Sequence, residues 1–241
     1  MSDRDKPDND SAVVVVEDLS KIYRQGSIDV AALSGVDLSI ERGDFAVLAG
    51  PSGSGKTTLL NLIGGLDTPT SGRVMVDGKD LAAMKSGARA KMRLNAIGFV
   101  FQAYNLIPVL SAYENAEYVM LLQGVPLAKR RSRVLSVLES VGLGGLDKRR
   151  PAELSGGQQQ RVAIARALAA EPSIVLADEP TANLDSKTGS DLCDLMRQLN
   201  VDSGLTFVIS SHDPMVIERA ARVIRLEDGK IISDERRAAA A

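Results

Sequence analysis

A glycine-rich segment near residue 50 carries the residue types that bind a triphosphate. Its sequence is Gly50-Pro51-Ser52-Gly53-Ser54-Gly55-Lys56-Thr57, followed by Thr58. Glycines let successive backbone N–H groups point into one concavity, a lysine supplies a charge for the β- and γ-phosphates, and a threonine hydroxyl can hold Mg²⁺. The apolar run 45–49 precedes the segment and helix-forming residues follow it. The segment is therefore predicted to be a phosphate-binding loop between a strand and a helix.

Two acidic residues follow another apolar segment. Residues 174–177 are typical of a buried parallel strand, and Asp178 and Glu179 come directly after it. Beside a triphosphate, Asp178 is predicted to hold a Mg²⁺-bound water opposite Thr57. Glu179 is predicted to be the general base for an attacking water. Either acid alone fits a solvated strand end, but the pair together with a phosphate loop indicates triphosphate hydrolysis.

Two further polar residues also follow apolar strands. Gln102 ends the run 97–101, at the carboxyl end where ligands bind in open α/β sheets. His212 follows the predicted strand 206–209 and is the only histidine in the chain, so no metal cluster of histidines is available. We expect His212 to contact the γ-phosphate or Glu179; the alternative is a structural histidine.

A second glycine-rich segment and a tyrosine complete the candidate residues. Leu154 precedes Ser155-Gly156-Gly157-Gln158, at the start of a helix predicted over 158–170. Free N–H groups at a helix start form an anion site. Tyr23 lies upstream of the phosphate loop, where its ring could stack on a nucleotide base; the alternative is a half-buried strand tyrosine.

The elements that position these residues alternate between strands and helices. The patterns predict short strands at 13–16, 30–33, 36–40, 45–49, 73–77, 97–101, 174–177, 206–209 and 222–226. Helices are predicted at 56–63, 85–96, 111–123, 126–141 and 158–170, with another that presents Leu192, Leu195, Met196 and Leu199 to a core. These elements predict an α/β domain with a β-rich N-terminal layer and a helical insert.

Composition restricts the function classes. The chain has 241 residues, 44% hydrophobic and 25% charged, with a net charge of −2, which gives no global reason to expect a nucleic-acid partner. The single cysteine, Cys193, cannot form an internal disulfide and is expected to be a buried thiol. No apolar run reaches the length of a membrane-spanning helix. Work at a membrane would therefore need another chain to cross it.

The candidate residues, in chain order, resemble the motif set of an ABC-type ATPase subunit. The phosphate loop, Gln102, the segment 154–158, the segment 174–180, Asn183-Leu184-Asp185 and His212 correspond to the Walker A, Q-loop, signature, Walker B, D-loop and H-loop motifs, and Tyr23 matches the A-loop. The resemblance covers Val13 to Ile232. It implies an α/β P-loop NTPase fold, with a mixed parallel core sheet, an N-terminal antiparallel β layer and a helical subdomain.

The resemblance also implies boundaries and roles. It implies one domain at 12–236, with core segments 12–102 and 155–236, a helical subdomain at 103–154, and tails at 1–11 and 237–241. It implies ATP and Mg²⁺ as cofactors. Catalysis would fall to Lys56, Gln102, Glu179 and His212; Tyr23, residues 50–58 and Asp178 would bind the nucleotide, and Thr57, Gln102 and Asp178 the metal. Residues 155–158 would close on ATP held by a second subunit in a head-to-tail homodimer.

The stretches 64–72, 99–108 and 177–185 are most similar to the lipoprotein-releasing (LolD-like) and macrolide-export (MacB-like) group, although Ala182 stands where many members have glycine. This group implies a place at the cytoplasmic face of the inner membrane beside a permease, with a periplasmic adaptor in some systems. Residues Ala103 to Glu117 would receive a permease helix, with apolar Leu106, Ile107, Val109 and Leu110; the alternative is that these four only pack the insert. An FtsE-like regulatory ATPase of a cell-wall or division machine is the alternative function. DNA-repair and translation ATPases would show a second cassette or an inserted module.

Overall fold

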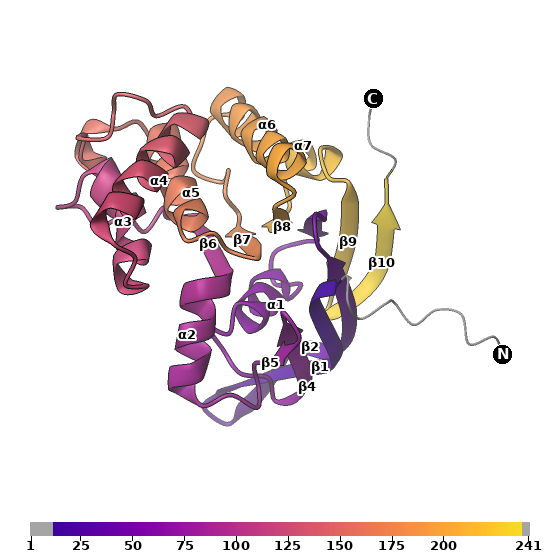
Figure 1. Ribbon diagram of the computed structural model, residues 1–241. Helices are drawn as coiled ribbons and strands as arrows, with labels where there is room; N and C mark the ends of the chain where they lie inside the picture. The colour runs from indigo at the N-terminus through magenta and orange to yellow at the C-terminus, as the bar shows by residue number, and fades with distance from the viewer. Residues whose placement is uncertain (1–11, 238–241) are drawn as a thin grey trace.

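The computed structural model describes residues 12–237, which form two β-sheets and the helices around them (Figure 1). One sheet is antiparallel, with the strand order β2-β1-β4-β5. Its strands are β1 (Ala12–Gln25), β2 (Ile28–Glu41), β4 (Ser71–Val76) and β5 (Lys79–Asp80). The sequence predicts this antiparallel layer before the phosphate loop, and the structure adds β4 and β5, which follow the loop, to the same sheet.

The second sheet is mixed and has the order β10-β9-β3-β8-β7-β6. Its first five strands in the chain are parallel to one another, and the last, β10, is an antiparallel edge strand. They are β3 (Phe45–Ala49), β6 (Ile97–Phe101), β7 (Ile174–Asp178), β8 (Thr206–Ser211), β9 (Arg222–Glu227) and β10 (Lys230–Arg236). Every residue of β3 and β8 is buried, as expected for parallel strands covered on both faces.

The strand register explains where the polar residues converge. Ala49 of β3 pairs with Ser211 of β8, Ser210 pairs with Asp178 of β7, and Asp178 pairs with Phe101 of β6. Parallel strands end at the same edge of a sheet. The four segments that follow these strands therefore leave from one edge, although they are far apart in the chain.

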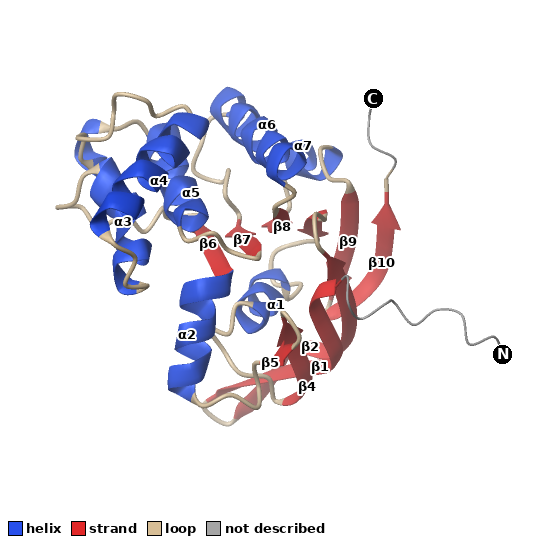
Figure 2. Cartoon of the chain, viewed as in Figure 1, coloured by secondary structure: helices blue, strands red, loops and turns tan. Residues whose placement is uncertain are grey.

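Helices cover both faces of the mixed sheet (Figure 2). Successive residues of β3 belong to different apolar clusters: Val47 packs with one and Leu48 with the other, because side chains alternate along a strand. The helices are α1 (Lys56–Ile63), α2 (Ser86–Ala96), α3 (Ala112–Leu122), α4 (Leu127–Ser140), α5 (Gly156–Ala169), α6 (Ser186–Ser203) and α7 (Pro214–Glu218), with a short 3₁₀ turn at Pro151–Glu153. Among residues 12–237, no helix is long and apolar enough to cross a membrane.

Helices α3 and α4 pack against α5 at the side of the molecule away from the antiparallel sheet (Figure 1). Their buried residues, such as Val134 and Leu138, belong to the same apolar cluster as Val100 of β6. Ser111 begins α3 with a capping box, in which its side chain accepts from Glu114 N and Glu114 accepts from Ser111 N. The helical insert is thus packed on the core through α5.

Several element boundaries differ from the sequence predictions. The segments 30–33 and 36–40 are one strand, β2, whose pairing with β1 continues past several register shifts. Gly35, at φ +61°, lies between the two segments. Helix α5 begins at Gly156, two residues earlier than predicted, because Ser155 is its N-cap. Strand β10 and helix α7 were not predicted, and Arg237, placed in a tail, donates from its backbone to Ala221 O at 2.7 Å. The predicted tail 1–11 and residues 238–241 lie outside the described residues.

Candidate functional site

The glycine-rich loop connects β3 to α1 and curls around the side chain of Lys56. The Lys56 ammonium donates to the carbonyl oxygens of Gly50 at 2.7 Å and Pro51 at 2.8 Å. Gly55 precedes α1 at φ +103°, and a Cβ there would lie 2.6 Å from Ala32 O. Only glycine fits that position without moving the neighbouring backbone. The loop and its lysine therefore form one compact unit at the start of the helix.

Asp178 faces the loop from the end of β7. The Thr57 hydroxyl donates to Asp178 Oδ1 at 3.0 Å, and the Ser210 hydroxyl donates to the same oxygen. Thr57 and Asp178 are 121 residues apart and meet because β3, β8 and β7 are adjacent. A hydroxyl and a carboxylate in contact are hard oxygen donors, which Mg²⁺ prefers.

Glu179 and His212 form a contact pair beside Asp178. His212 Nδ1 lies 2.8 Å from Glu179 Oε1, and the Ser211 hydroxyl donates to Glu179 Oε2 at 3.4 Å. The backbone of Glu179 has φ +44° and its N–H donates to Ser210 O at 3.1 Å. A positive φ is uncommon for a residue with a side chain and clusters at functional sites. The turn directs the carboxylate away from the strand, and His212 and Ser211 hold it there.

A pocket of about 350 Å³ lies at the carboxyl edge of the sheet, and Lys56, Thr57, Glu179 and His212 line it. Its lining combines loop residues with strand-end residues: Ala32, Ser52, Gly53, Gly55, Lys56, Thr57, Thr58, Gln102, Glu179 and His212. Within residues 12–237 no group of three His, Cys, Asp or Glu residues could hold a metal by itself. The Thr57 hydroxyl and the Asp178 carboxylate are oxygen donors that fit Mg²⁺, which is usually bound by one or two protein oxygens together with substrate phosphates.

Gln102 lies at the rim of the pocket on an exposed turn. Its backbone oxygen accepts a hydrogen bond from Asn183 Nδ2 at 2.9 Å, and its side-chain amide donates to Asn183 Oδ1 at 3.5 Å. The segment after β6 is thus joined to the segment after β7. Asn183 was noted in the sequence only as part of a motif, and its partner is 81 residues away.

The remaining predicted residues lie outside this pocket. Ser155 is exposed and caps α5 through a capping box with Gln158, so the N-terminus of that helix faces solvent. Gly156 and Gly157 form the first turn of α5. Tyr23 lies on β1, where its hydroxyl donates to Asp67 Oδ2 at 2.8 Å. The structure therefore brings the phosphate loop and the strand ends together in one pocket. Residues 155–158 do not line that pocket.

Sequence reasoning missed two side chains of α5 that support the pocket. Gln160 is fully buried and donates to Pro180 O at 2.7 Å and Phe101 O at 3.2 Å. Arg166 donates to Tyr104 O at 2.9 Å and also to Asn105 O, and burial lowers the pKa of its guanidinium. Both bind backbone oxygens, which no sequence pattern reveals. Helix α5 is thereby attached to the segments that carry Gln102 and Glu179.

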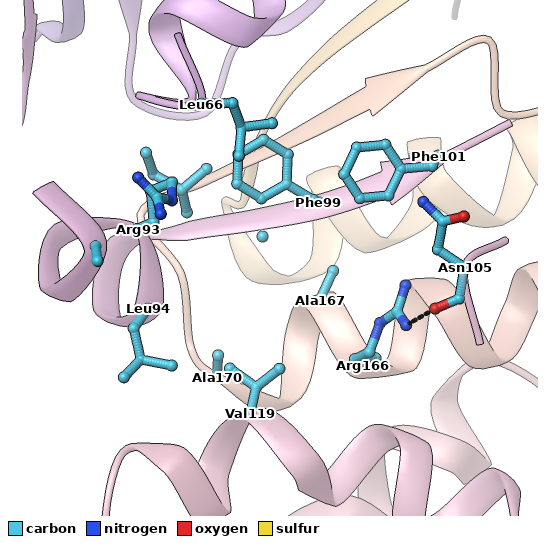
Figure 3. Close-up of a pocket in the computed structure, with 13 residues that line it drawn as sticks. Leu66, Arg93, Leu94, Phe99, Phe101, Asn105, Val119, Arg166, Ala167 and Ala170 are labelled. Atoms are coloured by element: carbon cyan, nitrogen blue, oxygen red, sulfur yellow. Dashed lines mark hydrogen bonds between the residues drawn. The ribbon is translucent and has the colours of Figure 1, made fainter. Parts of the chain in front are cut away.

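An apolar groove of about 440 Å³ lies beside these contacts, along the edge strand β6 (Figure 3). Phe99 and Phe101 present stacked rings, with centroids 5.6 Å apart. Other lining residues come from α2, α3 and α5, including Leu94, Val119 and Ala167. From the predicted permease segment, Ala103 to Glu117, only Asn105 lines this groove. Leu106 instead packs against the core cluster and Val109 remains 70% exposed, so that segment does not form the groove by itself.

Phosphate-loop nucleoside triphosphatases are the class of protein that this sheet order and this edge define. Residues 33–182, more than half of the chain, match the family described as ABC transporter, and the chain belongs to that family. It is an ATP-binding and ATP-hydrolysing subunit of that family.

Individual relatives agree with this assignment. The chain is 46% identical to a lipoprotein-releasing system ATP-binding protein, LolD 1, of Rhodopseudomonas palustris, over 91% of this chain and 98% of the relative. It is 45% identical to the macrolide export ATP-binding/permease protein MacB of Brucella melitensis, over 92% of this chain and 34% of that longer protein. Among solved structures, the ATP-binding cassette MJ0796, dimeric and bound to ADP and Pi after hydrolysis, superposes with a TM-score of 0.85 at 43% identity, covering 93% of this chain and 99% of that one.

Proposed function

We propose that the chain couples ATP-driven closure of a homodimer to an inner-membrane permease of the LolD/MacB type. The observation that carries the proposal is the single edge at which the phosphate loop, Asp178, Glu179 and His212 meet. That edge supplies a loop that binds phosphate, the oxygen pair of Thr57 and Asp178 for a metal, and the Glu179 carboxylate in contact with His212. Triphosphate hydrolysis needs these parts.

The contacts suggest a role for each residue. Lys56 would exchange its backbone oxygens for the β- and γ-phosphates, because an ammonium binds anions more strongly than neutral carbonyls. Glu179 would take a proton from the attacking water. His212 would hold the Glu179 carboxylate in place and contact the γ-phosphate. Thr57 and Asp178 would hold Mg²⁺, with the Gln102 side chain reaching the metal from the rim.

Replacing Glu179 with glutamine tests this proposal. The amide keeps the size and the contact to His212 but cannot accept the proton, so we expect ATP turnover to fall at least about a hundredfold. ATP affinity should persist, and size-exclusion chromatography with ATP should show more dimer than for the unchanged chain. Ordinary hydrolysis by Glu179→Gln would exclude Glu179 as the base.

We further propose that the groove along β6, together with the adjoining segment 103–117, receives a cytoplasmic helix of the permease. An apolar groove bounded by helices suits one apolar face of a partner helix. Arg166 holds the Tyr104 and Asn105 backbone at one end of the groove, close to Gln102. A helix seated there would contact Asn105, three residues after Gln102 of the ATP pocket, at the cytoplasmic face of the membrane.

A charge placed in the groove tests the docking. Leu66 lines the groove and is 47% exposed, so Leu66→Glu should fold and bind ATP but lose co-purification with the permease from detergent-solubilised membranes. Val201→Glu is the matched control, because Val201 is 67% exposed on α6 and does not line the groove. Equal recovery of the permease with both variants would show that the groove is not the docking site.

A further inference from the structure

Asp67 binds two side chains of β1 from the turn that follows α1. The Tyr23 hydroxyl donates to Asp67 Oδ2 at 2.8 Å, and the Lys21 ammonium donates to Asp67 Oδ1 at 2.8 Å. Lys21 also donates to Thr68 O at 2.8 Å. Asp67 is itself fixed, because its backbone N–H donates to Asn61 O of α1. The three side chains therefore form one cluster between β1 and the phosphate-loop helix.

The cluster holds its members in a defined arrangement. The Lys21 side chain is only 12% exposed and that of Asp67 29%, which is low for residues usually found in solvent. Burial would raise the pKa of Asp67, but the hydrogen bonds from Lys21, Thr68 and Tyr23 outweigh it and lower that pKa. Asp67 therefore stays a carboxylate, which accepts charge-assisted hydrogen bonds from Lys21 and Tyr23.

The hydroxyl of Tyr23 also lies against the first turn of the loop helix. Burial and the hydrogen bond to Asp67 raise the pKa of Tyr23, while the nearby Thr58 hydroxyl opposes the rise. Thr58 lines the ATP pocket. Tyr23 is thus held by Asp67, from the turn after α1, and Thr58 in the first turn of that helix lies nearby.

One face of the Tyr23 ring is occupied within the cluster. The Lys21 ammonium lies 4.8 Å from the ring centroid, a cation–π contact. A base that stacks on this ring must approach the opposite face. The ring plane and the stacking face are therefore set by Lys21 and Asp67 before any nucleotide arrives.

We propose that Asp67 is a positioning residue for the nucleotide base, which with Lys21 fixes the Tyr23 ring beside the phosphate loop so that adenine stacks on its free face. This inference rests on the proposed ATP-binding function and on the stacking role that the sequence predicts for Tyr23. A free tyrosine would lose side-chain freedom on binding, and the cluster removes that cost in advance. Its effect falls on the base alone, since neither Asp67 nor Lys21 lines the phosphate pocket.

ATP kinetics of the full chain, with inorganic tripolyphosphate as a competitor, test the proposal. Tyr23→Phe removes only the hydroxyl, and Asp67→Ala removes its acceptor. We expect each variant to raise KM for ATP about threefold to tenfold and to leave kcat within about twofold, the size of one ordered side chain. The inhibition constant of tripolyphosphate, which has no base, should not change. Asp67→Asn should restore KM, because the amide oxygen can still accept the hydrogen bond from the Tyr23 hydroxyl.

Two further variants separate the possible failures. Asp202→Asn, at an exposed position in the last turn of α6, is the control for loss of a carboxylate and should behave as the unchanged chain. Unchanged KM for ATP in Tyr23→Phe and Asp67→Ala, or an equal weakening of tripolyphosphate, would overturn the role of Asp67. If Tyr23→Ala also leaves KM unchanged, the stacking role itself is wrong, whereas a raised KM in Tyr23→Ala alone overturns only the positioning role.

Discussion

Cys193 shows how its environment determines the behaviour of a single side chain. It lies on α6, 1% exposed, and burial raises the pKa of its thiol to about 12. The folded chain therefore keeps this proton over a pH range in which the unfolded chain, with an ordinary thiol pKa near 9, loses it. Its stabilising contribution is complete below pH 9 and is lost as pH rises towards 12.

We therefore predict that the free energy of unfolding falls more steeply above pH 9 in the unchanged chain than in Cys193→Ala. The difference in slope should approach about 1.4 kcal/mol per pH unit, the limit for one titrating group. Urea unfolding at pH 7, 9 and 10.5 measures it, and comparison of the two chains cancels the lysines and tyrosines that titrate in the same range. Parallel curves would show that the thiol ionises freely in the folded chain.

At the residue scale, the sequence predicts which side chains do chemistry better than it predicts what holds them. The acid pair after β7 and the loop residues are recognisable because local apolar runs and glycines mark them. Ser210, which donates to Asp178, and Asn183, which binds Gln102, are not, because these pairs are 32 and 81 residues apart. Their roles depend on the order of the strands, and that order has no local signal.

Helices α5 and α6 meet at a position where only a hydrogen fits. A Cβ on Gly157 would lie 2.4 Å from Thr188 Cγ2 of α6. Thr188 cannot turn away freely, because its hydroxyl donates to Asp185 Oδ2 at 2.6 Å at the N-cap of α6. Gly157 therefore has a packing role besides the anion-binding role predicted from the sequence.

We predict that Gly157→Ala lowers the free energy of unfolding by about 1–3 kcal/mol, the usual cost of overpacking. Adding Thr188→Ser removes the methyl group but keeps the hydroxyl, and should recover most of that loss in thermal unfolding. Gly87→Ala on α2 is the control, since nothing lies within 4 Å of a Cβ there, and it should be neutral or stabilising by up to about 1 kcal/mol. A Gly157→Ala chain as stable as the control would contradict the proposed close approach.

At the scale of the elements, the sequence predicts the limits of a helix or strand well where the apolar pattern and the glycines at its ends agree. Helix α1 and strand β6 have the predicted limits, because glycines end the first and a continuous apolar run defines the second. The hairpin β1–β2 was divided into shorter strands because its bulges interrupt the alternation of apolar residues. Strand β10 was missed because its exposed, charged residues lack an apolar pattern; its partner β9 supplies the pairing instead.

At the scale of the whole molecule, the α5 N-terminus lies outside the ATP pocket of its own chain. Helix α5 nevertheless connects the two, because its side chains bind the segments that carry pocket residues. Gln160 binds backbone oxygens at the ends of β6 and β7, and the same helix presents Ser155 to solvent. An anion held at that N-terminus must come from outside the chain. A head-to-tail pair would supply it from the partner's ATP, and α5 would then join the two sites of the dimer.

The last prediction separates ATP binding from dimer closure. In the Glu179→Gln background, adding Ser155→Arg places a bulky side chain at the exposed N-cap of α5 without touching the chain's own pocket. We expect ATP affinity at concentrations that keep the chain monomeric to stay within about twofold, while the ATP-dependent dimer disappears in size-exclusion chromatography. Loss of the cap should cost only about 1 kcal/mol of stability. Ala88→Arg, exposed on α2, should leave the dimer intact. A dimer that persists in Ser155→Arg would mean that the subunits meet through another surface, because the arginine side chain should keep the α5 N-terminus away from the partner's ATP.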